Sequence, residues 1–337
     1  MTRPGARRLM PRSLLALLLA GTLVAASLQA EPQICVYTNA KGGVEQTNDL
    51  NQIPARFKST AKCFTPKQIS GKMEKPAEIA LKGNVREEHM GSSLGPINLR
   101  WPRKVEVLFG RTPQRAVAEA ATAVSRALKH GGFSVELQRL SLPWEIVFMD
   151  EELPEKQIPA YLVSNCHPAW MTPPANIYVV GQRVVAGCGD KTRPSTSVAD
   201  GQLAQVLIHE MGHAVEYQLL QGKATQERML AEGFACWFEQ YASDFAAVLS
   251  KGQVERQYMT WAKEALRQAP FGGAFSPTAH EYAKASLLFH ALVNRGGISR
   301  LSDVYGRMAE ERLDFYAAVK RTLGWDLAKL YAEAARF

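Results

Sequence analysis

The alternation of apolar and polar residues predicts a first half in which strands and helices are mixed. Residues 104–109 alternate in a way that is typical of a half-buried strand, and a short apolar run at 144–149 predicts a second strand. Between them, an Ala-rich helical periodicity extends over residues 112–130 and ends at Gly131 and Gly132.

The remainder of this pattern predicts a hairpin followed by a helical half. Residues 176–180 and 183–186 are β-rich and are joined by Gly181 and Gln182, which favours a hairpin. Every periodic segment from Gly201 onward has a helical period. A mixed region followed by helices alone indicates an α+β fold with a small mixed sheet.

The chain is predicted to carry a small module ahead of one larger domain. Within residues 31–66, β-rich stretches at 34–38 and 44–47 flank turn-forming residues, which predicts a β-hairpin module. This stretch resembles a small domain of unknown function at the front of exported bacterial envelope proteins. Residues 67–100 are polar, contain Gly, Ser and Pro without an apolar period, and predict a linker. The larger domain occupies residues 101–337.

The first 30 residues have the composition of an export signal. Four arginines precede an apolar stretch at residues 14–28, and Ala26 and Ala30 are candidate cleavage points. An uncleaved anchor is the alternative, although a stretch of this length is short for a bilayer. We expect a mature chain that begins near Glu31, is periplasmic or secreted, and is not stably inserted in a membrane.

Charge argues against a nucleic-acid-binding function. The whole chain of 337 residues has a formal net charge of +8, and the export signal removes four Arg and no acidic residue, which leaves +4. No run rich in Lys and Arg occurs after the signal. A small surplus spread over about 300 residues is not the footprint of a nucleic-acid-binding surface.

Five cysteines fit an oxidising compartment. Cys35 and Cys63 bracket the first mature segment, and Cys166 and Cys188 bracket a later one, so two local disulfides are the simplest pairing. Cys236 is left over in an apolar helical stretch and is expected to be a buried free thiol.

The motif that carries chemistry is His-Glu-x-x-His in the predicted helix after Gly201. His209 and His213 are four residues apart, so their imidazoles project from one helix face and can bind a single metal ion. Glu210 lies beside them, where its carboxylate can address a metal-bound water. Two neutral imidazoles suit zinc and leave room for a third protein ligand.

A third ligand is available on the next apolar helical stretch. Glu232 lies 19 residues after His213 in a run whose apolar neighbours make an unpaired carboxylate costly. Gly233 lacks a side chain, so we expect this helix to approach the helix of His209 closely. Glu239, two turns further on, is a candidate partner for a ligating histidine.

These motifs together resemble the gluzincin branch of zinc metallopeptidases over about residues 200–330. Thermolysin-type gluzincins carry an Asp four residues after the ligand Glu, where this chain has Cys236, so the resemblance favours the broader peptidase MA-like group. The helix around Tyr282 is similar to the Tyr-x-Lys-Gly helix of the aminopeptidase-N and leukotriene-hydrolase-like families, with Ala285 in place of the Gly. The resemblance gives the Tyr282 hydroxyl a role toward the tetrahedral intermediate; a half-buried helix aromatic is the alternative.

The resemblance implies a zincin-like domain and an exported zinc endopeptidase acting on peptides or proteins. One zinc ion per chain is held by His209, His213 and Glu232, and Glu210 acts as general base toward a metal-activated water. The edge of the hairpin at 176–187 is expected to pair with an extended substrate. The Gly-x-Met-Glu-Asn type segment of the exopeptidases does not occur in the sequence, so aminopeptidase activity is not expected.

Two other functions are compatible with the same residues. The first is a zinc amidase that acts on cell-wall peptides, because attack on an amide carbonyl is the same chemistry. The second is a catalytically inactive zincin that serves as a binding or assembly module. An intact Glu210 argues against the second, since a structural metal site needs no such acid.

Overall fold

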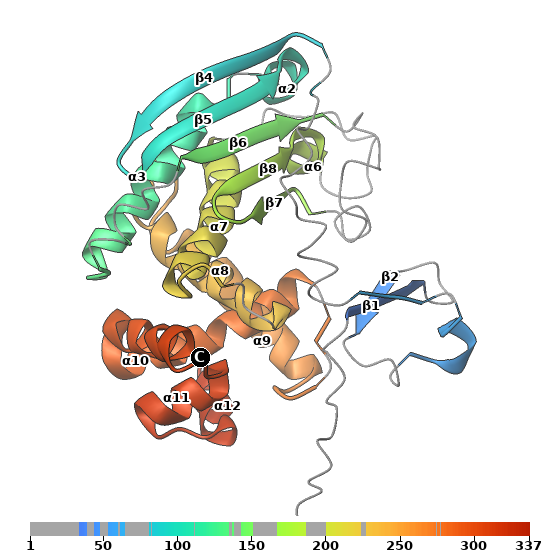
Figure 1. Cartoon of the computed structure of the whole chain (residues 1–337), viewed down its shortest axis with the longest axis vertical. Helices are drawn as coiled ribbons and strands as arrows, with labels where there is room; N and C mark the ends of the chain where they lie inside the picture. Colours follow the sequence, from blue (N-terminus) through green and yellow to red (C-terminus); the bar gives the residue numbers. More distant parts are fainter. Residues whose placement is uncertain are drawn as a thin grey trace, which may run out of the picture.

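A computed structural model of the chain shows the mixed α+β architecture that the sequence predicts (Figure 1). No helix among the residues that the structure describes is both long and apolar enough to cross a membrane. The predicted export signal, residues 1–30, and the predicted Cys166–Cys188 disulfide lie outside the described residues. The structure describes residues 34–38, 44–47, 53–59, 61–64, 81, 83–110, 112–134, 137, 143–150, 167–186, 200–223, 227–273, 275, 276 and 278–337.

A three-stranded antiparallel sheet lies at the start of the described chain. Its strands are β1 (Ile34–Thr38), β2 (Val44–Thr47) and β3 (Lys62–Phe64), in the order β2-β1-β3. The first two strands were expected from the sequence, whereas the third was not. The β1–β3 register pairs Cys35 with Cys63, so their backbones are direct neighbours across the ladder.

A second sheet of five strands positions the candidate site. Its order is β4-β5-β6-β8-β7, with β5, β6 and β8 parallel and an antiparallel strand at each edge. From Ile177 to Val180 β8 is buried and carries no charged side chain, as suits a strand with a neighbour on each side. The strands are β4 (Val85–Ser92), β5 (Gly95–Pro102), β6 (Trp144–Met149), β7 (Ala169–Thr172) and β8 (Asn176–Val180).

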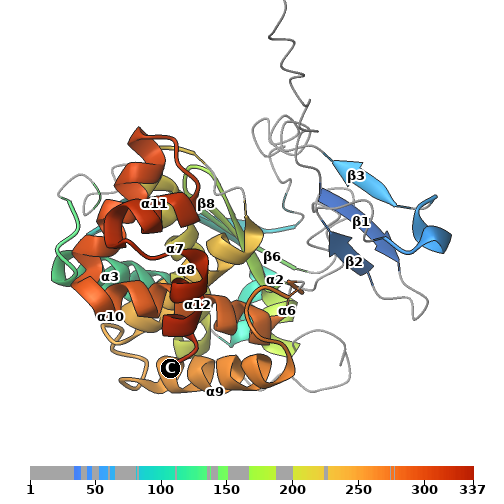
Figure 2. The ribbon, with the colours of Figure 1, turned by 90° about the horizontal axis from the view of Figure 1, so that it is seen from below.

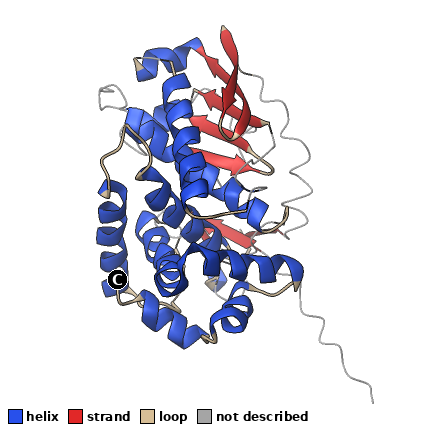
Figure 3. Ribbon diagram, turned by 90° about the vertical axis from the view of Figure 1, so that its left-hand side faces the viewer, coloured by secondary structure: helices blue, strands red, loops and turns tan. Residues whose placement is uncertain are grey.

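Helices pack on one face of this sheet (Figure 3). The predicted helix at 112–130 is observed as α3 (Gln114–His130), whose alanines allow close packing against α7 (Asp200–Leu219). Helix α7 also contacts β7 and β8, so the edge of the sheet lies beside the helix that carries the His-Glu-x-x-His motif. One apolar core extends from the sheet through these helices.

The chain from Asp200 onward is helical, as predicted. Helix α8 packs against both α7 and α10. Helices α11 and α12 lie at the opposite end of the molecule from the five-stranded sheet (Figure 1), the end nearer the viewer in Figure 2. Non-helical backbone at Gly296 and Gly297 kinks α10, and Gly297 has a φ of 73°. The helices are α8 (Arg228–Ser243), α9 (Gln253–Gln268), α10 (Ala279–Glu310), α11 (Phe315–Leu323) and α12 (Leu327–Ala334).

The strand predicted at 104–109 is wrong, because this segment is helix α2 (Arg103–Phe109). Val105 and Phe109 are fully buried and lie four residues apart, whereas Val107 between them is 78% exposed. The apolar positions therefore follow a helical period that a short segment also presents as alternation. Gly110 ends the helix in the left-handed conformation, with a φ of 65°.

The linker predicted at 67–100 is wrong from Val85 onward, where the chain forms strands β4 and β5. Ile97, Leu99 and Trp101 alternate with less buried residues along β5 and point into the core. Their period of two was hidden in a stretch rich in Gly, Pro and charge. The boundaries proposed for the N-terminal module and the larger domain stay predictions.

The hairpin predicted over 176–186 has the wrong second strand. Residues 176–180 do form a strand, β8, but residues 183–186 belong to the short helix α6 (Gly181–Ala186). Both edges of β8 are already paired, with β6 on one side and β7 on the other. The chain after β8 therefore has no edge to join, and the antiparallel partner of β8 precedes it in sequence.

Candidate metal centre

Helix α7 presents its two histidines on one face. One helical turn separates His209 and His213, and their ring centroids are 5.0 Å apart with an interplanar angle of 84°. The opposite side of the helix is anchored in the core by residues such as Leu207 and Met211, which are fully buried. The histidines are held by packing and keep 18% and 17% of their side chains exposed.

Glu232 comes from helix α8 and meets both histidines. Its Oε2 lies 3.5 Å from Nε2 of His209 and 3.8 Å from Nε2 of His213. Ligand atoms around a tetrahedral zinc ion, at bond lengths near 2.0 Å, are about 3.3 Å apart. The structure therefore brings the three predicted ligands into an arrangement that fits a zinc ion after a small contraction.

Two glycines set how closely α8 approaches its neighbours. A Cβ on Gly212 would lie 3.3 Å from Cα of Ala235, so α7 and α8 meet through small residues at this point. Gly233, which was expected from the sequence to make that contact, faces α10 instead. A Cβ on Gly233 would lie 3.0 Å from the backbone of Ala285. The expectation of a close approach at Gly233 was right, but the partner helix was wrong.

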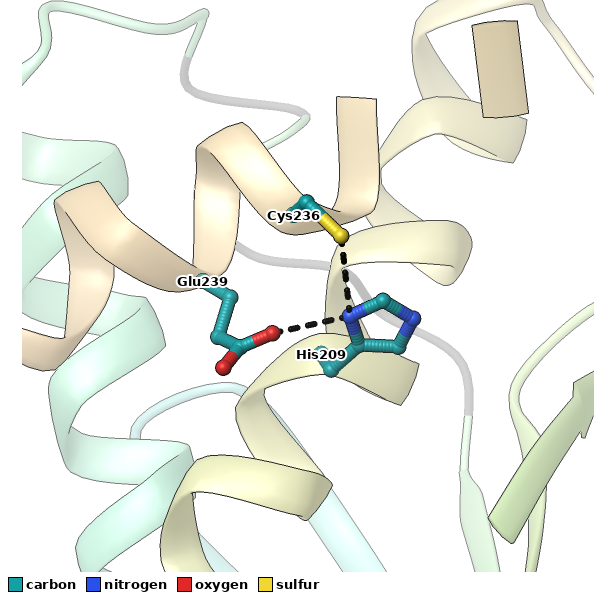
Figure 4. Close-up of side chains that lie close together, drawn as sticks. All are labelled: His209, Cys236 and Glu239. Carbon is teal, nitrogen blue, oxygen red and sulfur yellow. Dashed lines mark hydrogen bonds and ion pairs between the residues drawn. The ribbon is translucent and has the colours of Figure 1, made fainter. Parts of the chain in front are cut away.

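Glu239 holds the ring of His209 from the side away from Glu232. Its Oε2 lies 2.9 Å from Nδ1 of His209 (Figure 4). Gln205 donates to Oε1 at 2.7 Å, and the hydroxyl of Tyr258 donates to Oε2 at 2.6 Å. Because Nδ1–H of His209 donates to Glu239, the lone pair of His209 is on Nε2, which faces Glu232. The sequence-predicted contact between Glu239 and His209 is present.

The hydrogen-bond partners of His209 favour its positively charged form. Burial by itself lowers the pKa of His209, but hydrogen bonds with Cys236, Glu232 and Glu239 raise it well above its usual value. Burial raises the pKa of Glu232, but the hydrogen bond with His209 and the charge of His213 hold it well below its usual range. A metal ion at Nε2 brings the same positive charge in place of a proton.

The pKa values of His213 and Glu210 shift in the opposite directions to those of His209 and Glu232. Burial lowers the pKa of His213 to about 4, so its imidazole is neutral and has a lone pair for a metal at neutral pH. Burial also raises the pKa of Glu210 to about 8, although the charge of His209 and a hydrogen bond from the backbone of Met171 oppose the change. A carboxyl group with a pKa near the working pH suits a group that accepts and returns a proton.

A second group of metal-binding side chains shares His209. Sγ of Cys236 lies 4.0 Å from Nδ1 of His209, and with Glu239 these atoms are close enough together to hold an ion (Figure 4). Burial raises the pKa of the Cys236 thiol to about 11, however, and a metal ligand must be the thiolate. Glu239 is already engaged by Gln205 and Tyr258. The group with His213 and Glu232 is therefore the better metal site, and Cys236 is the buried free thiol that was expected.

Tyr282 projects from α10 toward the same region and is 7% exposed. Nη2 of Arg228 donates to its hydroxyl at 2.7 Å and lies 3.0 Å from Nε2 of His167. The rings of His167 and Phe275 both lie nearly parallel to that of Tyr282. Arg228 also approaches Glu232, with Nε 3.6 Å from Oε1. Arg228 thus contacts both the hydroxyl of Tyr282 and the candidate ligand Glu232.

Two residues of this cluster, Arg228 and His167, were not predicted from the sequence. Arg228 lies four residues before Glu232 and therefore on the same helix face, a spacing that could have identified it. His167 lies 42 residues before His209 and next to a cysteine, so no local pattern linked it to the motif. Burial lowers the pKa of His167 below its usual value. The charge of Glu232 opposes this shift, and the charge of Arg228 adds to it.

Compared with known proteins, the chain matches no family model and no curated protein. Its function must therefore be inferred from its own residues and their arrangement.

Proposed function

We propose that this protein is an exported zinc-dependent endopeptidase of the gluzincin type. The observation that carries the proposal is the convergence of His209, His213 and Glu232, with Glu210 buried beside them on the same helix. The three side chains would hold one zinc ion. When bound, the ion would act as a Lewis acid and lower the pKa of water at the site.

Glu210 acts as the general base in this proposal. Its carboxylate takes a proton from the attacking water and returns it to the leaving amine. The backbone N–H of Met171 donates to that carboxylate, which fixes its position next to strand β7. Burial, which raises the pKa of Glu210 to about 8, favours the return of the proton.

Tyr282 supplies a hydrogen-bond donor to the oxyanion that develops on the carbonyl. Its burial keeps the phenol neutral, because burial raises the pKa of the hydroxyl above its usual value. A neutral hydroxyl is a donor, whereas a phenolate would repel the oxyanion. Removal of one such donor typically costs a factor of about 10²–10³ in turnover.

Strand β7 supports a peptide as the substrate. Among the residues that the structure describes, β7 pairs only with β8, and it contacts helix α7, which carries His209 and His213. An extended peptide can add to such an edge through main-chain hydrogen bonds. The edge proposed for substrate pairing is therefore Ala169–Thr172, in place of the edge of the hairpin at 176–187 that was expected from the sequence.

Zinc content and zinc-dependent cleavage test the proposal together. The purified protein should hold about one zinc per chain and cleave peptides from a mixed library, and a chelator should abolish cleavage. Glu210→Gln should keep the zinc and lose turnover by several orders of magnitude, because the variant cannot accept a proton. Glu255→Gln, on an exposed glutamate of α9, is the matched control and should behave like the unmodified protein.

The outcomes distinguish the alternatives. Cleavage of cell-wall peptides without cleavage of casein favours the amidase. Zinc bound at one equivalent with no hydrolysis of any substrate favours the inactive binding module. Unchanged activity of Glu210→Gln contradicts the assigned mechanism.

A further inference from the structure

The guanidinium of Arg228 connects three separate parts of the fold at the candidate site. It extends from the first residue of α8 and contacts Tyr282 on α10, His167 ahead of β7, and Glu232 one turn further along its own helix. Its side chain is only 26% exposed, so these contacts are made largely out of water. Because little water screens it, the positive charge of Arg228 acts more strongly on these neighbours than a charge at the exposed surface would.

The direction of the hydrogen bond to Tyr282 is fixed by chemistry. A guanidinium has only donors, so the phenol oxygen accepts from Arg228 at 2.7 Å. The phenol's own hydrogen is left to be donated elsewhere. Among the residues that the structure describes, this hydrogen has no acceptor. The hydrogen bond from Arg228 therefore leaves the Tyr282 hydroxyl able to donate its hydrogen to a substrate.

Arg228 also fixes the tautomer of His167. Arg228 donates to Nε2 of His167 at 3.0 Å, so that nitrogen carries a lone pair and the ring proton of the neutral form lies on Nδ1. The ring of His167 stacks on Tyr282 with an interplanar angle of 16°, and Phe275 stacks on it at 24°. The orientation of the phenol is thus set by stacking, and its hydrogen-bond polarity by Arg228.

Charge acts in the same direction. Burial and the carboxylate of Glu232 both raise the pKa of Tyr282, whereas Arg228 lowers it. A cation next to the phenol oxygen makes the O–H a stronger donor to an anion. Its charge also offsets the negative field of Glu232 where the oxyanion would develop.

We infer that Arg228 is a positioning residue that aims the Tyr282 hydroxyl at the developing oxyanion. The inference rests on the proposed function, because it assigns Arg228 a role in the same peptide hydrolysis. It differs from a substrate-binding role in that Arg228 acts through Tyr282, and from a purely structural role in that its removal should change turnover without changing the fold.

A double-mutant cycle on zinc-loaded protein tests the inference. Tyr282→Phe should lower kcat by about 10²–10³-fold with little change in KM. Arg228→Met should lower kcat at least tenfold, again with little change in KM and with zinc content retained. The double variant should fall within about threefold of Tyr282→Phe, because Arg228 has nothing left to orient. Arg256→Met, which removes an exposed arginine of α9, is the matched control.

A spectroscopic readout is independent of activity. Long-range ¹H–¹⁵N spectra of zinc-free protein at fixed pH report which ring nitrogen of His167 is protonated. The unmodified protein should show the Nδ1–H tautomer, and Arg228→Met should shift His167 toward a mixture of both. If Arg228→Met does not fold, Arg228→Lys keeps the charge without the planar fork that reaches Tyr282 and His167, and the same changes are expected.

The failures are distinguishable. An unmodified protein that binds zinc and cleaves nothing contradicts the proposed function and, with it, the catalytic part of this inference. An active protein in which the losses from Arg228→Met and Tyr282→Phe multiply contradicts the inference alone, as does a rise in KM at constant kcat. An unchanged His167 spectrum in Arg228→Met also overturns it.

Discussion

Oε2 of Glu239 lies 2.9 Å from Nδ1 of His209, on the opposite side of the ring from Glu232. This contact decides which nitrogen of His209 faces the other two candidate ligands. A carboxylate that accepts from one imidazole nitrogen makes the other nitrogen a better metal ligand and fixes the ring plane. The zinc affinity of the site should therefore depend on a residue that does not bind the metal.

We expect Glu239→Gln to weaken zinc binding by about 10–100-fold, the usual effect of removing such a partner. The amide keeps the size of the side chain but loses the carboxylate whose hydrogen bond raises the pKa of His209. Competition with a chromophoric chelator measures the affinity. A variant with unchanged affinity would show that Glu239 has only a structural role.

His213→Ala and Cys236→Ala separate the two groups that share His209. His213→Ala should release the zinc, whereas Cys236→Ala should keep it, because burial holds the Cys236 thiol protonated. Metal analysis of the two dialysed variants is the measurement. The reverse pattern would place the metal on the Nδ1 side of His209.

The packing at Gly233 should be sensitive to added volume. A Cβ there already lies 3.0 Å from the backbone of Ala285, so Gly233→Val should destabilise the fold by about 1–3 kcal/mol. Gly306→Ala is the control, since a Cβ at that helical position of α10 meets nothing within 4 Å. It should raise stability by about 0.5–1 kcal/mol through helix propensity. Urea unfolding of both variants measures the difference; equal stabilities would contradict the close contact.

His290 should make the protein less stable as the pH falls. Burial lowers its pKa to about 4, against 6.5 in the unfolded chain, so the unfolded state binds more protons between these pH values. Its contribution is therefore complete above pH 6.5 and is lost as the pH falls toward 4.

His290→Gln should flatten this loss. Melting temperatures of both zinc-loaded proteins at pH 7.5, 5.5 and 4.5 should diverge only at the acidic values. Parallel curves across the whole range would show that His290 does not titrate in the folded protein as described.

Cys35 and Cys63 should form a disulfide in the oxidised protein. They are direct neighbours across antiparallel strands, where Cα atoms are about 4.5–5.5 Å apart, within the range that a disulfide spans. Peptide mapping under non-reducing conditions should recover this pair and Cys166–Cys188. Cys236, which is 1% exposed, should react with alkylating reagents only after unfolding. A Cys236 disulfide would contradict both the pairing and its burial.

Local spacing was sufficient to predict the centre of the candidate site. His209 and His213 share a helix face wherever they form a helix, and an acid in the apolar surroundings of Glu232 needs a partner in any fold. The helical half and strand β6 followed from periodicity for the same reason: their patterns are long or strongly apolar. The helix over 104–109 was missed because six residues fit both periods, and strands β4 and β5 because their alternation is interrupted by Gly, Pro and charge.

The tertiary structure decided everything that depends on residues from different elements. Arg228, His167 and Tyr282 meet from three separate segments, and no spacing in the sequence joins them. Which helix Gly233 contacts and which nitrogen of His209 faces Glu239 were likewise set by packing. Sequence periodicity determines the face of a helix on which a side chain lies, but only the packing of helices determines what that face meets.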